Sequence, residues 1–122
     1  MKFINATNQT VRLFDETSQR ILLELPTEPP AIETRVMDSY VVEYEDDATG
    51  AMVPVIRHDF QLLSDLPPEK DGVVYVVGWA VIQALFDAGE MRDDLIAPDT
   101  SRDSAVRDMN GRIVGVRKFR VM

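Results

Sequence analysis

The sequence predicts an α+β domain with an antiparallel β-sheet core, one buried helix and a C-terminal β-hairpin, assembled as an oligomer. Three patterns lead to this prediction: short runs of alternating apolar residues in the first half, an almost wholly apolar run at 78–89, and an Asn-Gly pair at 110–111. They are typical of strands, of a buried helix and of a tight hairpin turn, respectively. The chain has 122 residues, of which 45% are hydrophobic, so we expect one domain over residues 1–122.

The first half is predicted to form two hairpins. Apolar residues alternate at 11–13 and again at 21–25, on either side of the polar turn "DETSQ". The runs "YVVEYE" (40–45) and "MVPVIR" (52–57) flank the turn "DDATG" in the same way. Pro54 has no N–H to donate, so the second of these runs should lie at a sheet edge or at a bulge.

One helix is predicted in the second half. The stretch "DGVVYVV" (71–77) is typical of a buried strand and leads directly into "GWAVIQALFDAG" (78–89). Trp79, Ile82 and Phe86 recur at helical spacing, and Gly89 stands where a helix C-cap is expected. So few polar residues indicate a helix that is buried nearly all round. A domain this small needs a second subunit to cover such a helix, and we therefore expect a homo-oligomer.

The C-terminal segment is predicted to form a hairpin. The pair Asn110-Gly111 favours a type I′ turn, in which both residues have positive φ, between strands at 104–109 and 112–121. In the second strand Arg117 lies on the more apolar face, where Gly115 leaves room for another group to approach the backbone. An arginine on an apolar face needs a partner, so Arg117 is a candidate for binding an anion.

Charge is distributed unevenly along the chain. There are 21 Asp and Glu against 13 Lys and Arg, which gives a net charge of −8. Residues 102–122 hold six Lys and Arg against two Asp, or +4, which leaves −12 for residues 1–101. The acidic surface disfavours binding of nucleic acid, whereas a small anion in a local basic pocket is compatible with it. The simpler alternative is that these arginines pair with the acidic remainder of the chain.

The sequence also limits the compartment. It has no cysteine and no apolar run long enough for a signal peptide or a membrane span. We therefore expect a cytoplasmic protein that has no disulfide, uses no thiolate and does not bind a membrane.

Catalytic constellations are scarce. His58 is the single histidine, and its neighbour Asp59 should point to the opposite face of a strand. The acidic runs "EMRDDL" (90–95) and "EDD" (45–47) lack the spacing of a calcium-binding loop, and no phosphate-binding glycine motif is present. We therefore expect no catalytic residue, no metal and no cofactor, and a binding protein rather than an enzyme.

Two further features would suit a small phosphorylated nucleotide. Asp99 and Thr100 follow Pro98 in a polar loop, where they would hydrogen-bond a ribose hydroxyl or an adenine edge, or else cap a turn. Arg57 shares a strand face with two valines, so it either reaches the pocket of the terminal hairpin or extends to water at the sheet edge.

Several stretches resemble a known family when taken together. These are "NATNQTVRLFD" near the start, "GVVYVV" in the middle, and "LIAPDT" and "AVRDMNGRIVGVRKF" near the end. The pattern is similar to that of the Thoeris anti-defence proteins of the first kind, which phages and prophages encode. The resemblance extends loosely over most of the chain and is best over residues 95–119.

The resemblance implies a sponge rather than an enzyme. Such proteins bind cyclic ADP-ribose isomers made by bacterial TIR-domain defence enzymes, among them glycocyclic ADP-ribose, and hold them uncleaved. It also implies dimers and hexamers with ligands at subunit junctions, and uptake of cyclic oligonucleotides at separate sites in some relatives. Carried onto this chain, the resemblance and the residue analysis together give these candidate ligand-binding residues: Arg57, Phe86, Asp99, Thr100, Arg112, Arg117 and Phe119.

Two alternatives stay open at this point. One is a viral structural or assembly module, in which the arginines form subunit interfaces. The other is a small phosphodiesterase that uses His58 or a metal held by carboxylates.

Overall fold

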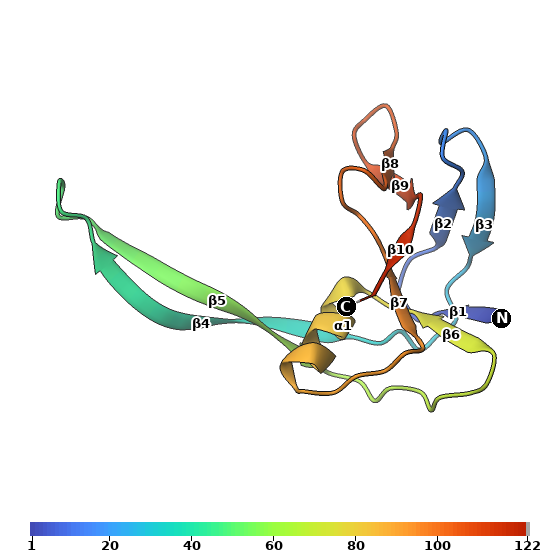
Figure 1. Cartoon of the computed structure of the whole chain (residues 1–122), viewed down its shortest axis with the longest axis horizontal. Coiled ribbons are helices and arrows are strands. Elements are labelled where there is room, and N and C mark those ends of the chain that lie inside the picture. The colour runs from blue at the N-terminus through green and yellow to red at the C-terminus, as the bar shows by residue number, and fades with distance from the viewer. Residues whose placement is uncertain (122) are drawn as a thin grey trace.

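The computed structural model describes residues 1–121 and is mostly β with a single helix in that range (Figure 1). The predicted α+β class is therefore confirmed. The elements in chain order are β1 (Lys2–Asn5), β2 (Val11–Phe14), β3 (Ile21–Leu25), β4 (Thr34–Glu45), β5 (Met52–Leu62), β6 (Val73–Val76), α1 (Trp79–Asp87), β7 (Leu95–Pro98), β8 (Ala105–Arg107), β9 (Ile113–Val116) and β10 (Phe119–Arg120).

The sheet beneath the helix has the strand order β1-β6-β7-β10. Both β1 and β7 run parallel to β6, and β10 alone is antiparallel to its neighbour β7. The prediction of an antiparallel core is therefore wrong for this sheet. The physical reason is the helix itself: α1 connects β6 to β7 as a crossover, which returns the chain to the same end of the sheet and makes the two strands parallel.

The hydrophobic core lies between this sheet and α1. Its buried members come from β6, α1 and β7, together with Ala6 just after β1 and Val77 just after β6. They are Ala6, Tyr75, Val77, Val81, Ile82, Leu85, Leu95 and Ala97.

Helix α1 occupies Trp79–Asp87 within the predicted span 78–89. Gly89 follows with φ of 74°, the left-handed conformation expected of a glycine that ends a helix. Val81, Ile82, Ala84 and Leu85 are buried, and the helix contacts both β7 and the base of β5, whereas Phe86 is 54% exposed. Burial nearly all round is therefore not reached within one chain, and cover by a second subunit stays a prediction.

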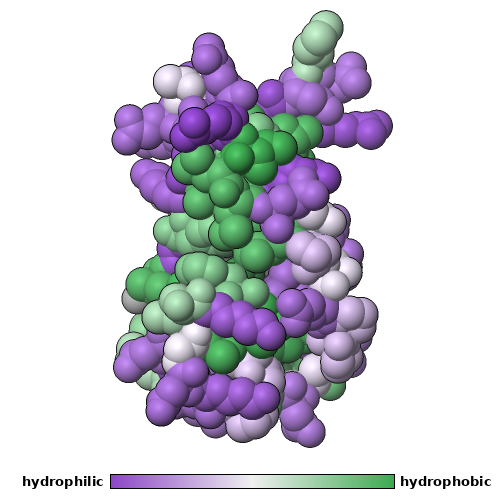
Figure 2. Space-filling model, turned by 90° about the vertical axis from the view of Figure 1, so that its right-hand side faces the viewer, coloured by the Kyte–Doolittle hydropathy of each residue, from purple (hydrophilic) through white to green (hydrophobic). Residues whose placement is uncertain are grey.

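A second sheet has the order β3-β2-β9-β8. The predicted hairpin around "DETSQ" is confirmed, with Val11 opposite Leu25 and Leu13 opposite Leu23. Figure 2 views the molecule from the side on which β3 and the N-terminus lie, and apolar side chains gather there between polar ones. Ile21 and Leu22 of β3, the edge strand, are about half exposed at 47% and 51%.

The C-terminal segment differs from its prediction in two respects. The long strand expected at 112–121 is divided into β9, which pairs with β8, and β10, which belongs to the first sheet. The turn is not type I′, because within the described residues Gly111 has positive φ (79°) and Asn110 does not. Asp108 N–H donates to the Arg112 carbonyl (2.9 Å), so the loop has three residues and ends on a left-handed glycine.

Strands β4 and β5 form a separate two-stranded sheet, which we call the arm (Figure 1). The predicted hairpin around "DDATG" is confirmed, and it extends further toward the body than the sequence indicated. Pro54 lies in a strand with a free edge, as predicted. No helix in the described part of the chain is long and apolar enough to cross a membrane.

Candidate functional site

A groove of about 640 Å³ separates the two sheets and meets the beginning of α1. The loop between β1 and β2 forms one wall, and β9 forms another. The lining residues are Thr7, Asn8, Gln9, Thr10, Val11, Arg12, Gly78, Trp79, Pro98, Thr100, Ile113, Val114, Gly115 and Val116. Ligand sites in proteins typically have volumes of about 300–1,000 Å³, so the groove is large enough for a nucleotide.

The charge of the groove differs from that of the chain. Among the described lining residues there is one arginine and neither a carboxylate nor an imidazole, although the chain carries 21 Asp and Glu. The lining instead offers hydroxyl and amide groups and the indole of Trp79. An anion therefore meets hydrogen-bond donors here, and no lining carboxylate repels it.

The wall formed by the β1–β2 loop is held by Asn5, which is 1% exposed. Its Nδ2 donates to the carbonyls of Gln9 (2.8 Å) and Leu25 (2.9 Å). Its Oδ1 accepts from the N–H (3.0 Å) and the hydroxyl (2.6 Å) of Thr7. One amide thus fixes the shape of the loop from inside. The sequence analysis missed Asn5, because a single asparagine carries no signal of burial.

Helix α1 begins at the groove. Gly78 is its N-cap and makes no side-chain cap hydrogen bond, and the first turn contains no acidic residue. The N-terminal end of a helix carries partial positive charge and free N–H groups, which favour an anion.

Trp79 is also the point where the C-terminal segment reaches the groove. Arg120 of β10 stacks on its ring, with Cζ 3.5 Å from the ring centroid. Arg12, on the opposite wall, pairs with Glu24 of β3 through Nε at 2.8 Å. Arg12 and Trp79 both line the groove, and each is engaged within the chain: Arg12 by an exposed carboxylate and the Trp79 ring by the Arg120 guanidinium.

Four of the predicted site residues lie near one end of the groove. Thr100 lines it directly, and Phe119 pairs with Pro98, which is also a lining residue. Asp99 donates its N–H to the Lys118 carbonyl (3.0 Å) and accepts from the N–H of Ser101 (3.0 Å). This hydrogen bond from Ser101 lowers the pKa of the Asp99 carboxyl below its ordinary value.

Arg117, the fourth of these residues, forms internal contacts. Its Nε donates to Ser18 Oγ (2.8 Å) and its Nη1 to the Asp103 carbonyl (3.1 Å), so it joins the β2–β3 turn to the loop before β8. The space expected beside Gly115 is filled by this chain. A Cβ built there would overlap the Phe14 ring and lie 2.8 Å from the Arg12 carbonyl. The missing Cβ of Gly115 thus permits β2 and Phe14 to approach the backbone of β9 on that side.

The remaining predicted site residues, Arg112, Phe86 and Arg57, do not line the groove of their own chain. The exposed Arg112 lies at the β8–β9 turn, where its N–H donates to Asp108 Oδ1 (3.0 Å). Phe86 lines a smaller groove of about 200 Å³ at the other end of α1. Arg57 lies on the arm and pairs with Asp59 (3.0 Å).

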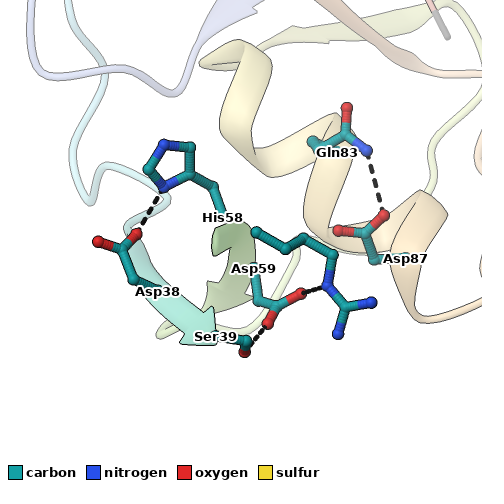
Figure 3. A network of polar contacts seen from close by, with 7 residues as sticks. Asp38, Ser39, His58, Asp59, Gln83 and Asp87 are labelled. Carbon is teal, nitrogen blue, oxygen red and sulfur yellow. Dashed lines mark hydrogen bonds and ion pairs between the residues drawn. The ribbon is translucent and has the colours of Figure 1, made fainter. Parts of the chain in front are cut away.

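Figure 3 draws polar contacts at the base of the arm, together with the Gln83–Asp87 hydrogen bond of the neighbouring helix α1. His58 and Asp59 point to opposite faces, as predicted, and His58 Nδ1 instead lies 2.6 Å from Asp38 across the two strands. Asp59 accepts from the Ser39 hydroxyl, which lowers the pKa of the Asp59 carboxyl, and Arg57 lowers it further. This pairing across the ladder was missed because the register of two strands is not fixed by either strand alone.

The acidic runs considered for metal binding have other partners. Asp94 of "EMRDDL" binds Arg92 at 2.6 Å, and Asp46 of "EDD" accepts from Thr49 within the arm's turn. Among residues 1–121, no group of three or more His, Asp or Glu side chains is placed to hold a metal ion.

No family model matches the chain, and no curated protein or solved structure matches it either. The resemblance to the Thoeris anti-defence proteins therefore stays a prediction.

Proposed function

We propose that the protein binds a small phosphorylated nucleotide of the cyclic ADP-ribose type and holds it without cleaving it. The observation that carries the proposal is the groove of about 640 Å³, whose described lining has an arginine, an indole and many hydrogen-bond donors but no carboxylate. In a chain of net charge −8 this is a local region suited to an anion.

The groove has separate features for the two parts of such a ligand. The start of α1, with no acidic residue in its first turn, suits the phosphates. Trp79, whose ring carries Arg120, offers an aromatic surface for the base. Arg12 on the opposite wall is a second contact for phosphate if Glu24 releases it.

The chemistry of the lining suits holding a ligand rather than transforming it. General acid–base catalysis needs a titratable group within hydrogen-bonding reach of the reacting proton. The described lining offers hydroxyls and amides, which titrate far from neutral pH. Sequestration needs tight binding and slow release only. In the setting that the resemblance implies, a phage protein with these properties would starve a defence effector of its signal in the host cytoplasm.

A homo-oligomer, dimer or hexamer, forms part of this proposal. Arg57 and Phe86 lie outside the groove of their own chain, on the arm and at the far end of α1. They would reach a ligand from a second copy. Cyclic oligonucleotides would then be candidates for separate sites at such junctions.

Calorimetric titration with glycocyclic ADP-ribose tests the proposal. We expect saturable binding that Trp79→Ala weakens roughly tenfold to a hundredfold, since stacking of a base on an aromatic ring contributes about 1–3 kcal/mol. Glu24→Gln should strengthen binding by releasing Arg12. Leu22→Ala, an exposed apolar side chain of β3 that lines neither groove, is the matched control and should leave the affinity unchanged. Absence of binding by the folded wild-type protein would sink the proposal.

A second candidate function is a viral structural or assembly module. The observation that favours it is the arm, which projects from the body with apolar side chains exposed. In that case the protein would bind no nucleotide in the titration above.

A further inference from the structure

The arm exposes eight large apolar side chains, each about half accessible to water. It is a sheet of two strands, and within the described residues no third strand pairs with it (Figure 1). Two-stranded hairpins are marginally stable alone, and exposed apolar surface of this kind marks an interaction site. The large apolar side chains of the arm that are between 48% and 62% exposed are Val36, Met37, Tyr40, Val41, Tyr44, Met52, Val53 and Ile56.

The charge of the arm narrows the choice of partner. Residues 36–56 contain five carboxylates and no Lys or Arg. Four of the five, Glu43, Glu45, Asp46 and Asp47, lie at or next to the turn that forms the tip. A partner surface for this end should therefore be basic and partly apolar.

The same chain carries such a surface. Residues 102–122 have a charge of +4, and the β8–β9 hairpin within them presents Arg107 and Arg112. Met109 at its turn is fully exposed and Ile113 is 42% exposed. In the described part of the chain, neither arginine forms an ion pair.

Within one molecule the two surfaces cannot meet. The tip of the arm points away from the body, and the β8–β9 hairpin lies on the body at a distance from it (Figure 1). A second copy supplies the missing complement. The 12 residues of β4 extend over about 40 Å, which is enough to reach across a small domain.

We propose that the arm of each molecule docks on a second copy of this chain, with its acidic tip against the partner's β8–β9 hairpin. The arrangement is reciprocal: about one twofold axis, the arm of each molecule contacts the β8–β9 hairpin of the other. The eight half-exposed side chains lie on both faces of the arm, so one face presents roughly 350 Å². Two arms and the partner surfaces that they cover together come to roughly 1,400 Å², within the size class of a stable interface.

A charge-reversal cycle on the full chain, followed by analytical ultracentrifugation, tests this contact. The tip variant is Glu45→Lys with Asp47→Lys, which spares Asp46 because its carboxylate holds the turn. The hairpin variant is Arg107→Glu with Arg112→Glu. We expect each to raise the dissociation constant of the dimer roughly tenfold or more, and the fourfold variant to restore much of the wild-type affinity.

The control carries the same change of charge elsewhere on the surface, Glu16→Lys with Glu28→Lys, and should dissociate like the wild type. A wild-type protein that is monomeric at tens of micromolar would overturn the proposal. A fourfold variant would also overturn it if its dissociation constant equals the value expected from adding the effects of the tip variant and the hairpin variant. The measurement records mass alone, so its outcome is separate from that of the nucleotide titration.

Discussion

At the scale of single residues, Ser104 determines where the last part of the chain changes sheets. The side chain is fully buried, with 0% of its surface exposed. Its Oγ accepts from the N–H groups of Arg117 (3.2 Å) and Lys118 (3.1 Å), the two residues between β9 and β10. The Arg117 N–H also donates to the Ser104 carbonyl (2.8 Å), which continues the β8–β9 ladder by one pair, whereas the Lys118 N–H has the hydroxyl as its acceptor. The hydroxyl therefore stabilises the break between the two strands.

Ser104→Ala should destabilise the fold by about 1–3 kcal/mol, because it leaves a backbone N–H without its acceptor in a buried place. Urea unfolding measures the loss. Hydrogen exchange should show faster exchange at the Lys118 amide, while the amide of Val106 on the neighbouring strand stays protected. A change in stability within about 0.5 kcal/mol, typical of surface substitutions, would contradict this role.

Asp99 makes the folding stability of the protein depend on pH through the loop after β7. Hydrogen bonds from Ser101 lower the pKa of its carboxyl in the folded protein. The contribution of Asp99 to stability is therefore complete above its unfolded pKa of about 3.9 and is lost as the pH falls through the lower folded value. Thermal unfolding of the wild type and of Asp99→Asn should differ at pH 7 and converge as the pH falls below the lowered pKa of the carboxyl. A difference that grows on acidification would have the wrong sign.

At the scale of elements, substitutions in the turn between β8 and β9 distinguish a type I′ turn from the three-residue loop. A type I′ turn needs positive φ at both Asn110 and Gly111, whereas this loop needs it at Gly111 only. Asn110→Ala should therefore change the free energy of unfolding by less than about 0.5 kcal/mol. Gly111→Ala should cost about 1–2 kcal/mol, because a Cβ is strained in the left-handed conformation. Equal costs in urea unfolding would indicate the type I′ turn instead.

Elements with strong local signals could be predicted from the sequence. The hairpins at 11–25 and 40–57 follow from alternation and turn residues, and the helix follows from its apolar spacing and Gly89. These signals act between residues close in the chain, so they need no knowledge of the remaining fold.

The elements that were missed depend on distant partners. Strands β1 and β7 have four residues each and are strands because both pair with β6. The division between β9 and β10 depends on Ser104, more than ten residues earlier. The groove likewise combines segments from both ends of the chain. The loop held by Asn5 and the indole of Trp79 were therefore not predicted as parts of it, whereas Thr100 was predicted from its polar loop.

At the scale of the whole molecule, three regions differ in chemistry. The arm is acidic and apolar, the C-terminal segment is basic, and the groove between the sheets is lined without carboxylates in the described residues. None of the described lining residues is a carboxylate, although Asp99 lies between two of them and Glu24 pairs with Arg12. Under the two proposals above, the groove would bind a small anion, and the arm and the C-terminal hairpin would provide contacts between copies.

The most direct test of the central claim is recovery of the ligand. The purified protein is mixed with an equimolar amount of glycocyclic ADP-ribose and separated from free ligand. It is then heated, and the released material is identified and quantified by mass spectrometry. We predict that intact ligand is recovered in near-stoichiometric yield from the wild-type protein and in far lower yield from Trp79→Ala. Recovery of linear or hydrolysed products would show an enzyme, and recovery of no ligand from the folded protein would contradict the proposed sequestration.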